Sequence, residues 1–129
     1  MDIAFAVYKT LFRMGYPFAY SLDDIADYLI AKHHLMAHWD DLLGDRIHHV
    51  RYEDLVSDQE YESRALLRAA GLDWDERVLD FHKASSPTAT ASAAQVRQPI
   101  HNRSIGAWRR HEEHFQGLFD RLSQAGVIA

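Results

Sequence analysis

The chain has 129 residues, a formal net charge of -5 and no cysteine. This length allows one modest domain or part of a larger one, and the absence of cysteine excludes disulfides and thiolate metal sites. The chain is 47% hydrophobic but has no run of about 18 apolar residues, which argues against disorder and against a membrane-spanning helix. The acidic balance argues against bulk nucleic-acid binding. The lack of cysteine fits a cytoplasmic location. From the charge balance and the lack of a spanning segment, neither a nucleic acid nor a membrane is expected as a partner.

Two helices are predicted in the first third of the chain. An apolar face at helical spacing predicts a helix over residues 3–13. That face is formed by Ile3, Ala6, Val7 and Leu11. The second helix is expected to start at the capping sequence from Ser21 to Asp24 and to end at Gly44. Its apolar positions are Ile25, Tyr28, Leu29, Leu35, Trp39 and Leu42.

The segment 46–52, with sequence RIHHVRY, is the best candidate for a β-strand, with His48, Val50 and Tyr52 on one face. One strand cannot form a sheet, so its partners would have to come from elsewhere. Either the strand prediction is wrong, or the sheet belongs to a segment or chain other than this one. The expected fold class is therefore mostly α with one or few strands.

The second half of the chain predicts three more helices and a long loop. One helix begins within residues 57–60 and closes at Gly71, and a short one follows Asp73 and ends near His82. Residues 84–103 are rich in Ala, Ser and Thr and contain two prolines, which predicts a loop. The final helix is expected over residues 106–124. Its apolar face is formed by Trp108, Phe115, Phe119 and Leu122.

The charge distribution singles out the segment from Phe81 to His111, which contains no Asp or Glu. It holds five of the 14 basic residues and none of the 19 acidic ones, so the rest of the chain carries a formal charge of -10. Arginine forks and the backbone amides of a small-residue loop suit phosphate or sulfate groups. The segment is therefore either an anion site or a solvated surface loop on an acidic protein.

Two further clusters have both a chemical and a structural interpretation. Tyr52, followed by Glu53 and Asp54, is either a ligand-contacting residue at the end of a strand or a core tyrosine before a helix. The histidine pairs 34/38 and 111/114 have helical metal-ligand spacing, with Asp40 or Glu112 as a third ligand, but solvated histidines are commoner. The sequence contains no Gly-rich phosphate loop and no Gly-x-Ser-x-Gly elbow.

The motifs VRYEDL (50–55), GLDWDERVLDFH (71–82), TASAAQVRQPI (90–100) and SIGAWRRHEEH (104–114) occur in this order along the chain. The ordered set resembles the C-terminal part of a sulfotransferase that uses 3′-phosphoadenylyl sulfate (PAPS). The most similar type is the bacterial one often fused to tetratricopeptide repeats, which is similar to tyrosylprotein sulfotransferases. The resemblance implies the C-terminal portion of a P-loop-like α/β sulfotransferase fold. It also implies transfer of a sulfuryl group from PAPS to a hydroxyl or amine acceptor.

The resemblance implies a set of cofactor-binding positions. Tyr52 is expected near the adenine, and the segment from Ser92 to Pro99 around the nucleotide. Arg110 matches a basic family position, and Gly106 matches a small residue in the last turn. The full expected set is Tyr52, Ser92, Gln95, Val96, Arg97, Pro99, Gly106 and Arg110.

The resemblance also shows departures from the family. The family's N-terminal loop for the 5′-phosphosulfate has no counterpart in these residues. Asp2 fits the Asp of the family's Arg-x-Pro-x-Asp motif, but Ala6 stands where a Ser is expected. Residues 1–129 are thus expected to form a partial sulfotransferase domain, with no catalytic base or metal assigned.

Two interpretations of function follow from this incomplete pattern. The first is a sulfotransferase whose partners are the nucleotide co-substrate, an acceptor of unknown identity and the missing N-terminal segment or another chain. The second is a degenerate, non-catalytic helical interaction module. The aromatic segment YPFAY (16–20) is either an acceptor wall or part of the core.

Overall fold

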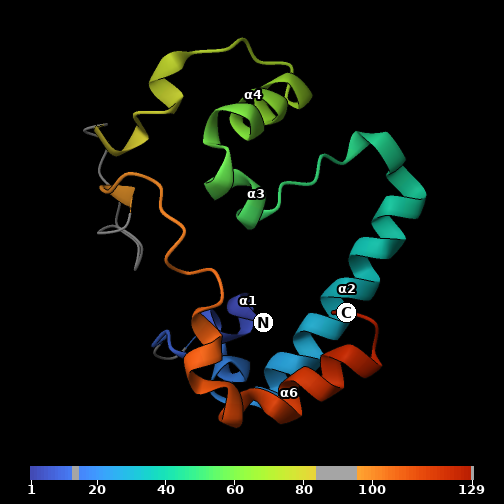
Figure 1. The fold of residues 1–129 in the computed structure, drawn as a ribbon. Helices are drawn as coiled ribbons and strands as arrows, with labels where there is room; N and C mark the ends of the chain where they lie inside the picture. The colour runs from blue at the N-terminus through green and yellow to red at the C-terminus, as the bar shows by residue number, and fades with distance from the viewer. Residues whose placement is uncertain (13–14, 84–95, 129) are drawn as a thin grey trace. The chain divides into compact units, whose positions relative to one another are not determined.

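The computed structural model describes residues 1–12, 15–83 and 96–128 of the chain. These residues form helices and connecting segments, with no β-strand in the described ranges (Figure 1). The chain divides into two compact units. Unit 1 comprises Met1–Ile47 and Ser104–Ala129, and unit 2 comprises His48–Arg103.

Unit 1 is built from three α-helices. These are α1 (Asp2–Tyr8), α2 (Leu22–Leu43) and α6 (Glu112–Gln124). Two short 3₁₀ helices accompany them, η1 (Pro17–Tyr20) before α2 and η5 (Ala107–His111) before α6. Helix α6 runs beside the N-terminal half of α2 (Figure 1). The apolar contacts of unit 1 form where these three helices meet.

The core of unit 1 is a cluster of small and aliphatic side chains. The buried members are Ala4, Ile25, Ala26, Leu118 and Leu122. The alanines let the helices approach closely, while Ile25 and Leu122 are 1% exposed and fill the space between them. Arg121 of α6 donates to the backbone oxygen and the carboxylate of Asp23 and pairs with Asp27, which adds a polar tie across the same helix pair. The register of α6 on α2 is therefore set by both apolar and charged contacts.

Helix α2 begins and ends where the sequence predicts. The Ser21 hydroxyl accepts a hydrogen bond from the Asp24 amide, and Gly44 adopts a positive φ of 51° at the C-terminus. Its apolar face, however, is buried only near the N-terminal end. Leu35, Trp39 and Leu42 are 39–63% exposed. Periodicity thus located the helix correctly but overstated how much of it packs in this chain.

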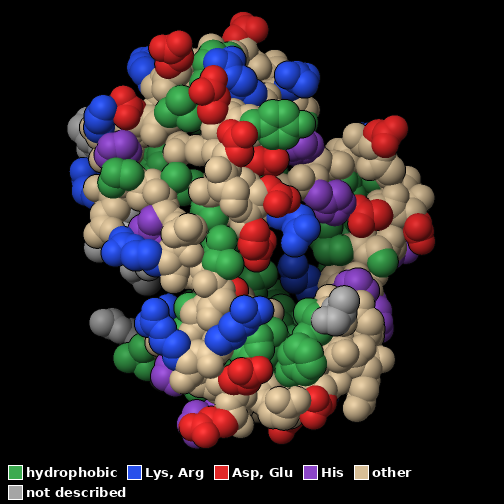
Figure 2. All heavy atoms as spheres, in the orientation of Figure 1, with side chains coloured by type: hydrophobic (Ala, Val, Ile, Leu, Met, Phe, Trp, Pro, Cys, Tyr) green, Lys and Arg blue, Asp and Glu red, His purple; other side chains and the backbone are tan. Residues whose placement is uncertain are grey.

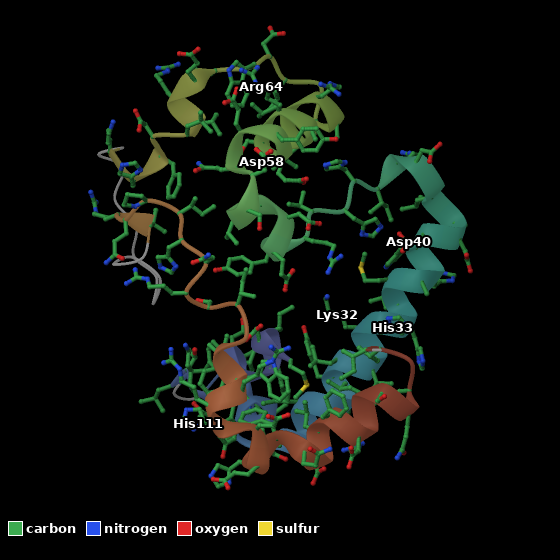
Figure 3. The ribbon with its side chains drawn as sticks, in the orientation of Figure 1. Lys32, His33, Asp40, Asp58, Arg64 and His111 are labelled. Carbon is green, nitrogen blue, oxygen red and sulfur yellow. The ribbon has the colours of Figure 1, made fainter. Side chains whose placement is uncertain are left out.

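Unit 2 contains α3 (Tyr52–Ser57) and α4 (Gln59–Ala69), followed by the 3₁₀ turns η3 (Glu76–Val78) and η4 (Phe81–Lys83). Helix α4 starts at Asp58, whose carboxylate accepts from the Tyr61 amide. Arg64 lies over the Trp74 ring, 3.9 Å from its centroid, and extends from α4 (Figure 3). Charged side chains of both signs alternate with exposed apolar ones over this unit (Figure 2).

The strand predicted over residues 46–52 is wrong. Gly44–Arg46 is a 3₁₀ turn (η2), and Tyr52 is the first residue of α3. Backbone amides and carbonyls of a strand need a ladder partner, and the described residues supply none. The acid pair Glu53 and Asp54 instead favours a helix N-terminus at Tyr52, because carboxylates stabilise the positive end of the helix dipole.

The first helix and the short helix after Asp73 also differ from the predictions. Helix α1 ends at Tyr8 rather than at residue 13, and Thr10 Oγ1 donates to the Ala6 carbonyl just beyond its end. The residue that α1 buries is Ala4, whereas Ile3 is 60% exposed. After Asp73 the chain forms two separate 3₁₀ turns rather than one helix. Past the end of α1, Leu11 is 79% exposed and provides no packing that would extend the helix.

No helix within the described ranges is long and apolar enough to cross a membrane. This agrees with the hydropathy of the sequence.

Candidate functional site

The eight residues predicted for the cofactor are divided between the two units. Gly106 and Arg110 lie in unit 1, and a second group lies in unit 2. That second group is Tyr52, Val96, Arg97 and Pro99. The predictions for Ser92 and Gln95 lie outside the described residues. The predicted residues therefore form two separate groups, one in each unit.

In unit 2, Tyr52 is tied to the segment that follows Pro99. Its hydroxyl donates a hydrogen bond to the backbone carbonyl of His101 over 3.2 Å, across 49 residues of sequence. Tyr52 is 43% exposed, so part of the residue remains accessible to solvent. Residues 96–99 are exposed, and Arg103 Nη2 donates a hydrogen bond to Gln98 Oε1 over 3.0 Å. Sequence reasoning missed His101, because a backbone carbonyl leaves no signal in the side-chain pattern.

In unit 1, the turn before the final helix is held by the second residue of the chain. The Asp2 carboxylate accepts from the Gly106 amide at 2.8 Å and from the Trp108 amide at 3.4 Å. Gly106 has a φ of 69°, in the left-handed region that an L side chain rarely adopts. Because its amide already donates to Asp2, Gly106 is set apart by its backbone conformation and not by a free donor.

The arginines beside this turn differ in their surroundings. The Arg109 guanidinium lies 5.9 Å from the centroid of the Trp108 ring. Trp108 in turn stacks on Phe119, with ring centroids 6.4 Å apart. Arg110 is exposed, and no hydrogen bond, ion pair or ring contact to it is found in the described ranges. Arg110 is therefore a guanidinium that a bound anion can recruit without breaking an existing contact.

The aromatic segment 16–20 separates into buried and exposed parts. Phe18 stacks on Tyr28, with centroids 4.4 Å apart, and packs against the core of unit 1. Tyr16 and Tyr20 are 61% and 45% exposed. The structure thus assigns Phe18 to the core and leaves the two tyrosines on the surface.

The histidine pairs do not assemble a metal centre in the part of the chain that the structure describes, where no group of three His, Asp or Glu side chains is placed to hold an ion. The His34/His38 pair lies on the exposed side of α2. His111 instead stacks on Phe5, with ring centroids 5.3 Å apart and the planes inclined by 26°. The metal interpretation with Asp40 or Glu112 therefore finds no support.

Comparison with known proteins defines the class to which these units belong. A family model described as "Sulfotransferase family" matches residues 1–76, which is more than half of the chain. The chain therefore belongs to the sulfotransferase family. The matched residues include Asp2 and Tyr52 but end before the basic segment.

A relative from Aquifex aeolicus (strain VF5), named only as an uncharacterized protein, is 33% identical over 129 residues. That match covers 96% of this chain but only 17% of the relative, so the chain spans a small part of that protein's length. No solved structure matches the chain.

Proposed function

We propose that this chain forms one side of the cofactor site of a PAPS-dependent sulfotransferase, which transfers a sulfuryl group to a hydroxyl or amine. Membership of the sulfotransferase family supports the reaction class. The observation that carries the cofactor assignment is the acid-free segment ending in Arg109 and Arg110, on a chain that is otherwise strongly acidic. PAPS is a polyanion, and it is bound best where carboxylates are absent and guanidinium groups are exposed.

The proposed contacts come from residues of both units, each taken within its own unit. The partly exposed Tyr52 side chain offers a stacking surface for the adenine. The hydrogen bond from its hydroxyl to the His101 carbonyl holds the segment after Pro99 next to Tyr52. Arg97 and Arg110 supply positive charge for the phosphate and sulfuryl oxygens. Sulfuryl transfer resembles phosphoryl transfer, in which cations stabilise charge on the equatorial and bridging oxygens. No catalytic base is assigned.

We further propose that residues 1–129 are a partial sulfotransferase domain of the bacterial tetratricopeptide-associated type, similar to tyrosylprotein sulfotransferases. The domain would be completed by the α/β part that holds the phosphosulfate, supplied by another segment or chain. The exposed apolar stripe Leu35, Trp39 and Leu42 fits a helix that packs against more protein than these residues provide.

Calorimetric titration of the chain with 3′-phosphoadenosine 5′-phosphate tests the proposal. The unmodified chain is expected to bind this desulfonated nucleotide with measurable heat at millimolar concentration or below. Arg110→Ala should weaken binding by about 1.5–3 kcal/mol, or about tenfold to 150-fold, the scale of a hydrogen bond between charged groups. Arg68→Ala, which removes an exposed arginine from α4, is the matched control and should leave the affinity unchanged.

Absence of binding at millimolar nucleotide would contradict the proposal and favour a non-catalytic interaction module. Equal losses in Arg110→Ala and Arg68→Ala would show that only overall charge matters, and would remove Arg110 from the site.

A further inference from the structure

A carboxylate near one end of the chain binds the turn that precedes its final helix. The Asp2 carboxylate accepts from the amides of Gly106 and Trp108, so the two hydrogen bonds join residues 104 and 106 positions apart. These are contacts between α1 and the start of η5, both in unit 1.

The helical stretch from Ala107 to Gln124 needs acceptors for its first amides, because those amides have no partner within the helix. Its own flanking sequence does not provide a side-chain acceptor: the residue before η5 is Gly106, and the residue before α6 is His111. Asp2 fills this role from a distant part of the chain. Its negative charge also suits the positive end of the helix.

Asp2 is placed by a helix that is itself firmly packed. Ala4, two residues further along α1, is fully buried. Phe5 stacks on His111 and meets Phe115 edge-on, with ring centroids 5.3 and 5.8 Å apart. Helix α1 is thus docked on the same turn that Asp2 caps, and the carboxylate cannot drift from the amides without breaking these contacts.

We propose that Asp2 is a positioning residue for the cofactor: it fixes the turn that carries Arg109 and Arg110, so that Arg110 is presented to the nucleotide. This inference rests on the proposed function. Because the Gly106 and Trp108 amides are occupied by Asp2, they are not the groups that bind the phosphates. Recognition of the anion at this turn then falls to the guanidinium groups, whose direction depends on the turn.

Amide hydrogen exchange tests the cap without any nucleotide. In Asp2→Ala, protection of the Gly106 and Trp108 amides should fall about fivefold to thirtyfold, which is the scale of losing a side-chain cap at a helix N-terminus. Asp2→Asn keeps one side-chain oxygen, so it can accept from only one of the two amides and should restore the protection of that amide alone. Asp41→Ala, which removes an exposed aspartate from α2, is the matched control and should leave both amides protected.

A double-mutant cycle with 3′-phosphoadenosine 5′-phosphate then tests whether Asp2 acts through Arg110. With Arg110 in place, Asp2→Ala should weaken binding about fivefold to thirtyfold, and Asp2→Asn, which keeps one of the two acceptor oxygens, should recover part of it. In the Arg110→Ala background, Asp2→Ala should cause no further loss, because the side chain that it positions is gone. A merely structural role would give the same loss in both backgrounds.

Three outcomes overturn the inference. Equal losses in both backgrounds would show that Asp2 does not act through Arg110. A gain in affinity in Asp2→Ala would show that the carboxylate repels the nucleotide. If the unmodified chain binds no nucleotide, the proposed function and the positioning role fail together, while the exchange measurement still decides whether Asp2 caps the turn.

Discussion

The two units of this chain are stabilised internally by different kinds of contact. Unit 1 contains every buried apolar side chain found in the described residues, namely Ala4, Ala19, Ile25, Ala26, Phe115, Leu118 and Leu122. In the described part of unit 2, the only buried residue is Ser63. Its longer-range ties are polar or aromatic, such as Tyr52 to the His101 carbonyl, Gln59 to the Leu79 carbonyl and Arg64 over Trp74.

This difference predicts different stabilities. Burial of apolar surface is the main favourable term in folding, whereas an exposed hydrogen bond has a net value of only about 1 kcal/mol. Unit 2 also contains three buried side-chain nitrogens without a protein partner in the described residues, on Trp74, His82 and His101. We therefore expect unit 2 to open at lower free energy than unit 1, and to gain order when ligand or further protein covers it.

A matched pair of leucine truncations should give the largest contrast. Leu122→Ala in unit 1 should lower the free energy of unfolding by about 2–5 kcal/mol, because Leu122 is 1% exposed and its removal leaves a cavity among α1, α2 and α6. Leu66→Ala in unit 2 should cost about 1 kcal/mol or less, because Leu66 is already 44% exposed. Urea denaturation followed by far-ultraviolet circular dichroism measures both. Equal losses of unfolding free energy in the two variants would mean that Leu66 is packed in an apolar core in solution, and would contradict the difference between the units.

Helix caps should give an intermediate effect and allow the units to be compared one contact at a time. Asp58→Ala removes the acceptor for the Tyr61 amide at the start of α4 and should cost about 1 kcal/mol of local stability. Hydrogen exchange of the first-turn amides of α4 measures this loss as a roughly fivefold fall in protection.

Asp58→Asn is the control for that cap, because Asn caps about as well as Asp while removing the charge. Ser21→Ala removes the corresponding cap of α2 in unit 1, where the hydroxyl accepts from the Asp24 amide. If unit 2 is the weaker unit, Asp58→Ala should expose the whole of α4 to exchange, whereas Ser21→Ala should affect only the first turn of α2. Exchange confined to the first turn in both variants would contradict the difference between the units.

The same contrast explains which elements the sequence could predict. Helix α2 was predicted with both of its ends, because Ser21, Gly44 and the apolar repeat are all local signals. The final helix was predicted from its periodicity, and its buried face includes Phe115 and Leu122 as expected. The segment 46–52 was misassigned, because alternation alone cannot supply the hydrogen-bonding partners of a strand.

The candidate site was less predictable than the helices. The resemblance to sulfotransferases singled out Tyr52, Gly106 and Arg110, and the family is confirmed. The contacts that organise these residues were not predicted, because they join Asp2 to Gly106 and Tyr52 to His101 through backbone groups at large sequence separation. Such contacts depend on tertiary packing, which leaves no periodic pattern.

The smallest expected effect concerns a contact local to unit 2. The side chain of Arg77 hydrogen-bonds both carboxylate oxygens of Asp75, and the Arg77 amide donates to the same carboxylate at 2.9 Å. These bonds lower the pKa of Asp75 from 3.8 to about 2, and the side-chain bonds have a larger effect than the backbone bond. Nuclear magnetic resonance titration of the Asp75 carboxyl should show this value. Arg77→Ala should raise the pKa toward 3.8, but not fully, because the backbone donor remains.

The sign of the pH effect follows from that lowered pKa. The ionised carboxylate favours the folded turn above about pH 4, and this contribution disappears as the pH falls through 3.8 toward 2. Because the Arg77 side chain is 91% exposed, solvent and salt screen the pair, so Arg77→Ala should leave global unfolding at neutral pH unchanged. Loss of unit 2 structure in Arg77→Ala at neutral pH would contradict this expectation. It would show that surface ion pairs stabilise unit 2 as strongly as buried apolar side chains stabilise unit 1. An unshifted Asp75 pKa in the unmodified chain would show that the hydrogen bonds between Arg77 and the Asp75 carboxylate are not formed in solution.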